Sequence, residues 1–150
     1  MFEFADPRVV SIADKVQQTI VPSGVVIWFL KGEFIHVIAH TNSPIDCPMK
    51  RIMSRQNSVG HLVCEMNKTL VLDDTLSHPL MKTSNVVLTY GVMAYLGTPF
   101  HLGAIPVGGI SVVHQHPRRW DVSDVACLED AAQQMSDLAE NDAQNSPHKP

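Results

Sequence analysis

Two side chains that together could support thiol chemistry, His61 and Cys64, lie three residues apart. On a helix this spacing puts both side chains on one face. An imidazole beside a thiol can generate a thiolate, which is the form that acts as a nucleophile or as a redox sensor. A free cysteine is more often a small buried hydrophobe, and the sequence shows no third residue that would orient His61. The pattern therefore favours a structural Cys64, with a thiol-dependent reductase that uses Cys64 as the alternative.

Four histidines share strand faces in pairs, His36 with His40 and His114 with His116. Neutral imidazole is the commonest transition-metal ligand, so a metal site would form if the two faces coincided. No cysteine or carboxylate stands at a tight ligand spacing beside them. We therefore expect these to be surface or rim histidines and expect no metal site.

A third group of polar side chains, Ser84, Asn85 and Tyr90, precedes a predicted strand that contains Tyr95. A small-molecule pocket needs a few directed polar groups among apolar ones, and these residues could supply them. The alternative is ordinary solvation of a loop.

The elements that must position these residues alternate between helical and strand periodicity. Apolar steps of three and four predict helices over residues 7–20 and 121–140, and two short helical pieces over 49–66 with a weak helix at 84–89. Runs rich in β-branched and aromatic residues predict strands at 25–30, 34–40, 69–72, 92–100 and 108–116, with a hairpin loop at 101–107. Strict alternation would put Ile35, Val37 and Ala39 on one face of the second strand. The order predicts one α+β domain over residues 1–140, followed by a disordered tail at 141–150.

Composition restricts the class of protein. The 150 residues are 45% hydrophobic and 17% charged, which suffices for one buried core. A net charge of −4 gives no electrostatic basis for binding nucleic acid, and the longest apolar run is too short to span a membrane. Three cysteines without C-x-x-C spacing favour a reducing compartment. We therefore expect a cytoplasmic protein with neither nucleic acid nor membrane as a partner.

Short motifs recur in a characteristic order through the second half of the chain. They are GHLVC at 60–64, KTLVLDD at 68–74, HP at 78–79, GVMAYLGTPF at 91–100, VGGISV at 107–112 and PRRWDVSD at 117–124. This ordered set resembles the GAF family of bacterial and eukaryotic sensor domains, and the likeness covers about residues 7–140.

The resemblance implies a five- or six-stranded antiparallel sheet with the first and last helices on one face. On the other face, short helices and loops from about residue 58 to 90 would roof a small-molecule pocket. The resemblance and the polar pattern together nominate six ligand contacts: His61, Cys64, Ser84, Asn85, Tyr90 and Tyr95.

The family's usual ligands each require residues that this chain lacks. Bilin-binding members use a Cys beside a His, and some haem-binding members use a His, in the region that here spans residues 84–91 and contains neither. The Asn-Lys-Phe-Asp-Glu set of cyclic-nucleotide members is not found, and the several pocket cysteines of methionine-sulfoxide-reducing members reduce to Cys64. We therefore expect no haem and no covalent bilin, and the identity of the ligand stays open.

The sequence thus predicts a non-catalytic sensory or regulatory domain that binds a small molecule. Val125, Leu128, Ala132, Met135 and Ala139 recur at helical spacing. This seam, together with the first helix, predicts a homodimer through the first and last helices. The downstream partner, and whether the chain stands alone or belongs to a longer protein, are open at this point.

Overall fold

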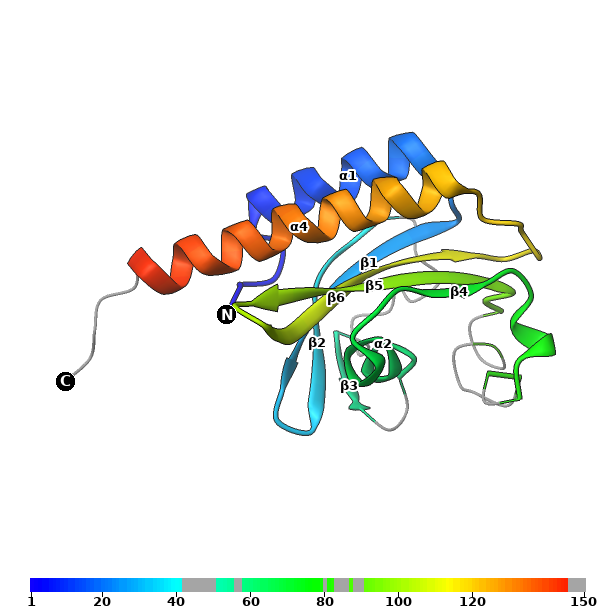
Figure 1. Cartoon of the computed structure of the whole chain (residues 1–150), viewed down its shortest axis with the longest axis horizontal. Coiled ribbons are helices and arrows are strands. Elements are labelled where there is room, and N and C mark those ends of the chain that lie inside the picture. The colour runs from blue at the N-terminus through cyan, green and yellow to red at the C-terminus, as the bar shows by residue number, and fades with distance from the viewer. Residues whose placement is uncertain (42–50, 56–57, 80, 83–86, 88–90, 146–150) are drawn as a thin grey trace.

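A six-stranded antiparallel sheet with the strand order β3-β2-β1-β6-β5-β4 forms the centre of the structure (Figure 1). The computed structural model describes residues 1–41, 51–55, 58–79, 81–82, 87 and 91–145. The strands are β1 (Gly24–Lys31), β2 (Phe34–His40), β3 (Ile52–Ser54), β4 (Leu70–Leu72), β5 (Ala94–Leu102) and β6 (Ile105–His114). The predicted α+β architecture is confirmed.

Two long helices, α1 (Pro7–Ile20) and α4 (Val122–Asn145), lie side by side on one face of the sheet (Figure 1). The Asp6 side chain accepts a hydrogen bond from the Arg8 N–H and caps α1, with Pro7 in the first turn. At the start of α4, Asp121 Oδ1 accepts from the Asp124 N–H (2.8 Å) and Asp124 Oδ2 from the Asp121 N–H (3.1 Å). This reciprocal capping box fixes where α4 begins.

The helices bury their apolar stripes against the sheet and thereby form the larger of two cores. Fully buried members include Val9, Ile27, Phe100, Leu128 and Met135. Four residues of the seam predicted for dimerisation, Leu128, Ala132, Met135 and Ala139, belong to this core. The seam therefore packs within one molecule, and a dimer through these two helices would have to use other residues of them.

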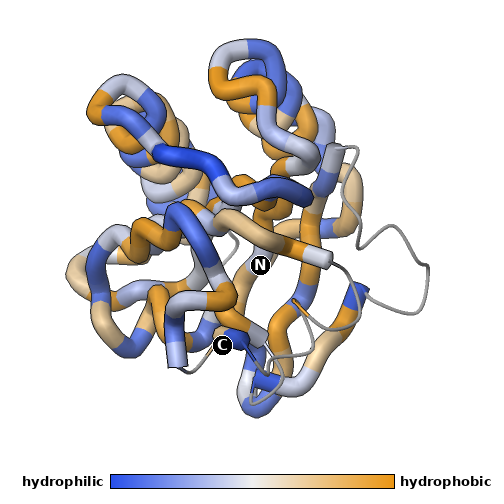
Figure 2. Tube along the Cα trace, turned by 90° about the vertical axis from the view of Figure 1, so that its right-hand side faces the viewer, coloured by the Kyte–Doolittle hydropathy of each residue, from blue (hydrophilic) through white to orange (hydrophobic). Residues whose placement is uncertain are grey.

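A smaller core lies on the opposite face of the sheet. There the short helix α2 (Gly60–Met66) packs its Val63 and Cys64 against strand residues that include Trp28 and Tyr95. The 3-10 turn η3 (Thr75–Ser77) follows β4. Figure 2 views α1 and α4 nearly end-on and shows both on one side of the strands, with the short segments on the other. This arrangement matches the predicted two-sided cover. None of the helices in the described ranges is long and apolar enough to cross a membrane.

Four local predictions need correction. Part of the segment 49–66 was predicted as helix, but residues 52–54 form the edge strand β3, which pairs with β2. The second correction concerns the predicted loop 101–107, which is a two-residue turn because β5 ends at Leu102 and β6 begins at Ile105. Gly103 supplies the positive φ (62°) that the turn requires. Pro106, which cannot donate to the ladder, pairs beside a register shift.

The third correction concerns β2. Trp28 pairs with Val37 and Ile27 with Ala39, so Ile38 is the extra residue of a bulge. The bulge reverses the alternation: Ile35 and Val37 face the smaller core, whereas Ile38 and Ala39 both join the larger one.

The fourth correction concerns the predicted tail. Helix α4 continues through residues 141–145, where Asp142 accepts two hydrogen bonds from the Arg8 guanidinium (2.8 and 2.9 Å). This contact attaches the last turns of α4 to α1. Residues 146–150 lie outside the described part, as does nearly all of the helix expected at 84–89.

Candidate ligand pocket

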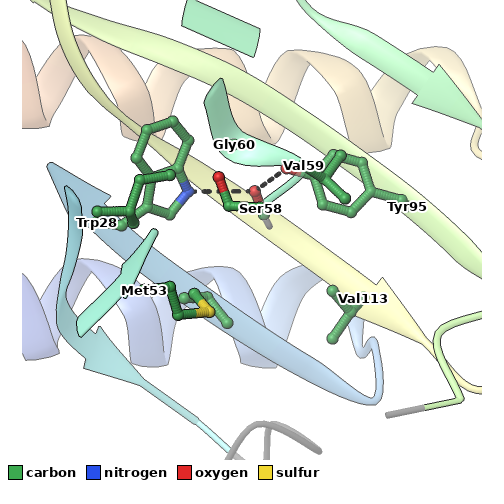
Figure 3. A pocket seen from close by; sticks show the side chains of 10 residues that line it. Trp28, Met53, Ser58, Val59, Gly60, Tyr95 and Val113 are labelled. Carbon is green, nitrogen blue, oxygen red and sulfur yellow. Dashed lines mark hydrogen bonds between the residues drawn. The ribbon is translucent and has the colours of Figure 1, made fainter. Parts of the chain in front are cut away.

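A cavity of about 40 Å³ lies in the smaller core between the sheet and the start of α2, and it is partly open to solvent (Figure 3). Strands β1, β5 and β6 supply its floor, β2 and β3 one wall, and the residues that lead into α2 its roof. The lining residues are Val26, Trp28, Ile35, Met53, Ser58, Val59, Gly60, Tyr95, Ser111 and Val113. The cavity thus lies on the sheet face for which the sequence predicted a pocket, away from the terminal helices.

Three polar side chains on the floor form one hydrogen-bonded chain. The indole Nε1–H of Trp28 donates to Ser111 Oγ (3.3 Å), and the hydroxyls of Ser111 and Tyr95 lie 2.5 Å apart. Dashed lines in Figure 3 mark these two hydrogen bonds, which begin at Trp28 and end at Tyr95. Each comes from a different strand: Trp28 from β1, Tyr95 from β5 and Ser111 from β6. Because β6 lies between β1 and β5, Ser111 is placed to bridge the two aromatic side chains.

Glycines make room for the two aromatic rings. A Cβ on Gly109 would lie 2.5 Å from Trp28 Cζ2, and a Cβ on Gly97 would lie 2.7 Å from Tyr95 Oη. Gly60, at the start of α2, approaches the same indole, since its Cβ would lie 2.8 Å from Cζ2. The rings can lie against the strands and under α2 only because these three positions carry no side chain.

The roof is held by Ser58. Its Oγ donates to the Arg55 carbonyl (3.0 Å) and accepts from the His61 N–H (3.4 Å). Ser58 therefore joins the end of the β3 segment to the first turn of α2, directly above the cavity.

The cavity carries no charge in the part of its lining that the structure describes. Its one titratable side chain there is Tyr95, and burial strongly raises the pKa of that phenol. The Tyr95 side chain is therefore a neutral hydrogen-bonding group at physiological pH.

The residues nominated from the sequence fall into three groups. Tyr95 lines the cavity. His61 and Cys64 lie on α2 beside it, with His61 Nδ1 donating to the Ser58 carbonyl (2.5 Å) and Cys64 Sγ to the Gly108 carbonyl (3.5 Å). Ser84, Asn85 and Tyr90 lie outside the described residues, so their predicted contacts stay predictions.

Cys64 has the environment of a structural cysteine. Its side chain is buried in the smaller core, and burial raises the pKa of the thiol to about 11. At neutral pH the Cys64 side chain is therefore the thiol rather than the nucleophilic thiolate.

Two of the histidines that share strand faces, His36 and His114, contact other groups of the protein. His114 Nδ1 accepts from the Ser23 N–H (3.1 Å), and burial lowers the pKa of this imidazole. His36 stacks on Phe29, with ring centroids 5.2 Å apart. Across the described ranges, no group of three or more His, Cys, Asp or Glu side chains could hold a metal ion.

Comparison with known proteins identifies the family. The family model described as GAF domain matches residues 9–137. The chain belongs to the GAF domain family. No curated protein sequence matches the chain.

Solved structures share the fold of this GAF domain at low sequence identity. One is the GAF domain of an Acinetobacter phosphoenolpyruvate-protein phosphotransferase, with 12% identity, a TM-score of 0.74 and coverage of 95% of this chain and 94% of that chain. A second is the GAF domain of a two-component sensor histidine kinase from Bacillus halodurans (15% identity, TM-score 0.73, coverage 95% and 98%). A third is the free methionine-R-sulfoxide reductase from Neisseria meningitidis in complex with its substrate (14% identity, TM-score 0.74, coverage 91% and 78%). The fold therefore occurs in both sensory and catalytic proteins.

Single-sequence reasoning missed Trp28, Ser58 and Ser111 as pocket residues. Trp28 and Ser111 lie on strands that the sequence predicted, although with shifted ends. The sequence does not show which face of each strand meets α2. The signal that could have pointed to them is the Gly-Gly-Ile-Ser run at 108–111, because consecutive glycines leave space for a large neighbouring side chain.

Proposed function

We propose that this GAF domain is a non-catalytic sensory or regulatory module that binds a small molecule in the pocket between the sheet and α2. The observation that carries the proposal is the cavity itself, which is apolar, partly open and floored by a buried chain of three polar groups. This combination is typical of small-molecule sites. The shared fold with a GAF domain of a sensor histidine kinase supports a sensory role.

A thiol-dependent reductase is the second candidate, because free methionine-R-sulfoxide reductases have the same fold. It would require a reactive thiolate in the pocket. Cys64 is instead a buried thiol with a raised pKa, and its proton is directed to the Gly108 carbonyl. We therefore favour binding without catalysis.

We further propose that a ligand acts on α1 and α4, with a second copy of the chain as the partner of these helices. Strand β6 lines the pocket through Ser111 and Val113 and leads to Arg118. The Arg118 guanidinium donates to the carbonyls of Ile20 (2.6 Å) and Val21 (3.1 Å) at the end of α1. A shift of β6 would thus be passed to the helix pair. The cysteine pattern supports a cytoplasmic location for this module.

Native mass spectrometry of the freshly purified protein tests ligand binding. We expect a mass excess that is released on denaturation, is kept by Cys64→Ser and is lost by Val113→Phe, which fills the cavity. Val71→Phe, on the exposed side of β4, is the matched control. A protein without bound mass, whose Trp28 indole N–H resonance is also unmoved by a metabolite extract, would contradict the proposal.

A further inference from the structure

We propose that the pocket selects small, uncharged, largely apolar molecules that carry a hydrogen-bond acceptor such as a carbonyl oxygen. This inference rests on the proposed function, since it names the chemical class that the same site would bind. It follows from a count of the protons on the pocket floor.

The three floor side chains own three polar hydrogens but make only two hydrogen bonds with one another. Trp28 Nε1–H donates to Ser111, and one hydroxyl of the Ser111–Tyr95 pair donates to the other. Whichever way that pair is arranged, one hydroxyl proton is left over. It belongs to Ser111 when Tyr95 donates, and to Tyr95 when Ser111 donates.

This remaining proton is buried and borders the cavity. Ser111 and Tyr95 are each only 3% exposed, and both line the pocket. Within the described part of the chain, neither hydroxyl has a hydrogen-bond partner outside the chain of three. A buried donor without a partner is unfavourable. A bound molecule with a hydrogen-bond acceptor at this position would therefore be stabilised.

The walls determine the rest of the ligand. The described lining is otherwise made of Val26, Ile35, Met53, Val59, Gly60 and Val113, together with Ser58, whose hydroxyl already bonds Arg55 and His61. A charged group would lose its hydration there with no opposite charge to replace it. The 40 Å³ volume limits the buried part to a few heavy atoms, with the remainder at the open side.

Three small probes of similar ring size separate the chemical classes. Cyclopentanone carries only an acceptor, pyrrole carries only an N–H donor, and cyclopentanecarboxylate carries a charge. Each is titrated into 15N-labelled protein while the Trp28 indole N–H resonance is followed. The Trp120 indole is the internal control, because it lies in the larger core and donates to the Leu72 carbonyl (3.1 Å).

We expect cyclopentanone to shift the Trp28 resonance and to bind on the order of tenfold more tightly than pyrrole, which leaves the spare proton without an acceptor. Cyclopentanecarboxylate should leave the Trp28 resonance unchanged over the same concentration range. The Trp120 resonance should move with none of the three.

Two variants test the proton count itself. Tyr95→Phe leaves the spare proton on Ser111, so the preference for cyclopentanone over pyrrole should persist within about threefold. Ser111→Ala leaves both the Trp28 N–H and the Tyr95 O–H without a partner, so the preference should increase further, by roughly tenfold. A merely polar contact at Ser111 would predict the reverse, a loss of preference in Ser111→Ala.

The outcomes separate this inference from the proposed function. Tighter binding of pyrrole or of cyclopentanecarboxylate, with a shift at Trp28, would overturn the acceptor rule and leave a functioning pocket. If none of the three probes moved Trp28 and native mass spectrometry found no bound mass, water alone would fill the cavity, and both proposals would be wrong. The wild-type and Tyr95→Phe titrations decide between these cases even if Ser111→Ala is too unstable to study.

Discussion

The Trp28 indole is the residue on which the pocket floor and its roof both depend. It contacts Gly60 of α2 and Gly109 of β6, and its N–H begins the hydrogen-bonded chain to Ser111. A side chain at either glycine would displace the ring. The position of the ring beside the cavity therefore depends on the absence of a side chain at Gly60 and at Gly109.

Gly109→Ala should destabilise the fold by about 1–3 kcal/mol, the usual cost of overpacking a core. Its Cβ would lie 2.5 Å from Trp28 Cζ2 and 2.9 Å from the Thr98 carbonyl, which is backbone and cannot rotate away. Urea denaturation of Gly109→Ala, Trp28→Phe and the double variant measures the coupling between the two positions. The penalty should be smaller in the Trp28→Phe background, because phenylalanine lacks the atoms that clash. Equal penalties in both backgrounds would contradict this account.

Cys64 should react slowly with iodoacetamide in the folded protein. Burial raises the pKa of its thiol from 9.0 to about 11, so at pH 7.5 the thiolate fraction falls roughly 100-fold relative to the unfolded chain. The rate should rise about tenfold per pH unit up to pH 11, as followed by peptide mass spectrometry with urea-unfolded protein as the reference. The half-buried Cys127 is the control for access. If Cys64 in the folded protein reacted at pH 7.5 as fast as in urea, the result would favour the reductase over the non-catalytic domain.

Of the residues that line the cavity, Tyr95 was predicted from the sequence, through the polar residues that precede its strand and the resemblance to the GAF family. Ser111 was not nominated, because a serine in a strand gives no sign of facing two aromatic side chains on neighbouring strands. That juxtaposition depends on the pairing register of β1, β6 and β5, which is a tertiary property.

At the scale of elements, local rules located the two long helices and most strands, and they failed where pairing overrides local preference. Residues 51–54 read Arg-Ile-Met-Ser, which favours neither state strongly, and only the partner strand β2 makes them β3. The bulge at Ile38 likewise has no local signature, since it arises from fitting β2 to β1. The caps of α1 and α4, by contrast, act within one helical turn, so they depend on neighbouring residues alone.

Asp121→Ala should remove half of the capping box of α4 and lower the melting temperature by roughly 2–4 °C at pH 7. Hydrogen bonds from the Ser123 hydroxyl (2.6 Å) and from the Asp124 N–H (2.8 Å) lower the pKa of Asp121 below its ordinary value of 3.8. A lowered pKa contributes stability above the unfolded-state value, and that contribution is lost as the pH falls through the folded-state value. The melting curves of wild type and variant should therefore converge below about pH 4.

Asp130→Ala is the matched control, because it removes an exposed carboxylate from the middle of the same helix without touching the cap. Calorimetry over a range of pH compares all three proteins. A deficit of Asp121→Ala that stayed constant from pH 7 to pH 3 would show that the carboxylate charge is not what caps α4.

At the scale of the whole molecule, the sheet separates the cavity from the helix pair that we propose as the signalling surface. The pocket lies on the α2 side, and the pair of α1 and α4 lies on the other (Figures 1 and 2). Helix α4 has 24 residues, about 36 Å of helix, and in Figure 1 it extends beyond the adjacent end of α1. Among the helices in the described part of the chain, α4 is the longest and so offers the most extended surface on which a second copy could pack.

The homodimer proposed through these helices should be weak and should become stronger with salt. The apolar seam is used up against the sheet, so the contact has to come from residues such as the half-buried Val10, Cys127 and Leu138 at the helix edges. The exposed side also carries the carboxylates Asp130 and Asp137, which two copies would bring near one another. Sodium chloride screens this repulsion: the screening length is about 10 Å at 0.1 M and 3 Å at 1 M.

Sedimentation velocity at tens of micromolar, roughly the range in which weak dimers populate, should show a larger dimer fraction in 0.5 M than in 0.05 M sodium chloride. The double variant Asp130→Asn/Asp137→Asn should dimerise more strongly at low salt and lose most of the salt dependence, because the repelling charges are gone while the shape is kept. A dimer that dissociates with added salt would instead indicate an interface held by opposite charges, elsewhere on the surface. A 16.6 kDa monomer at every salt concentration, in both proteins, would rule out this dimer.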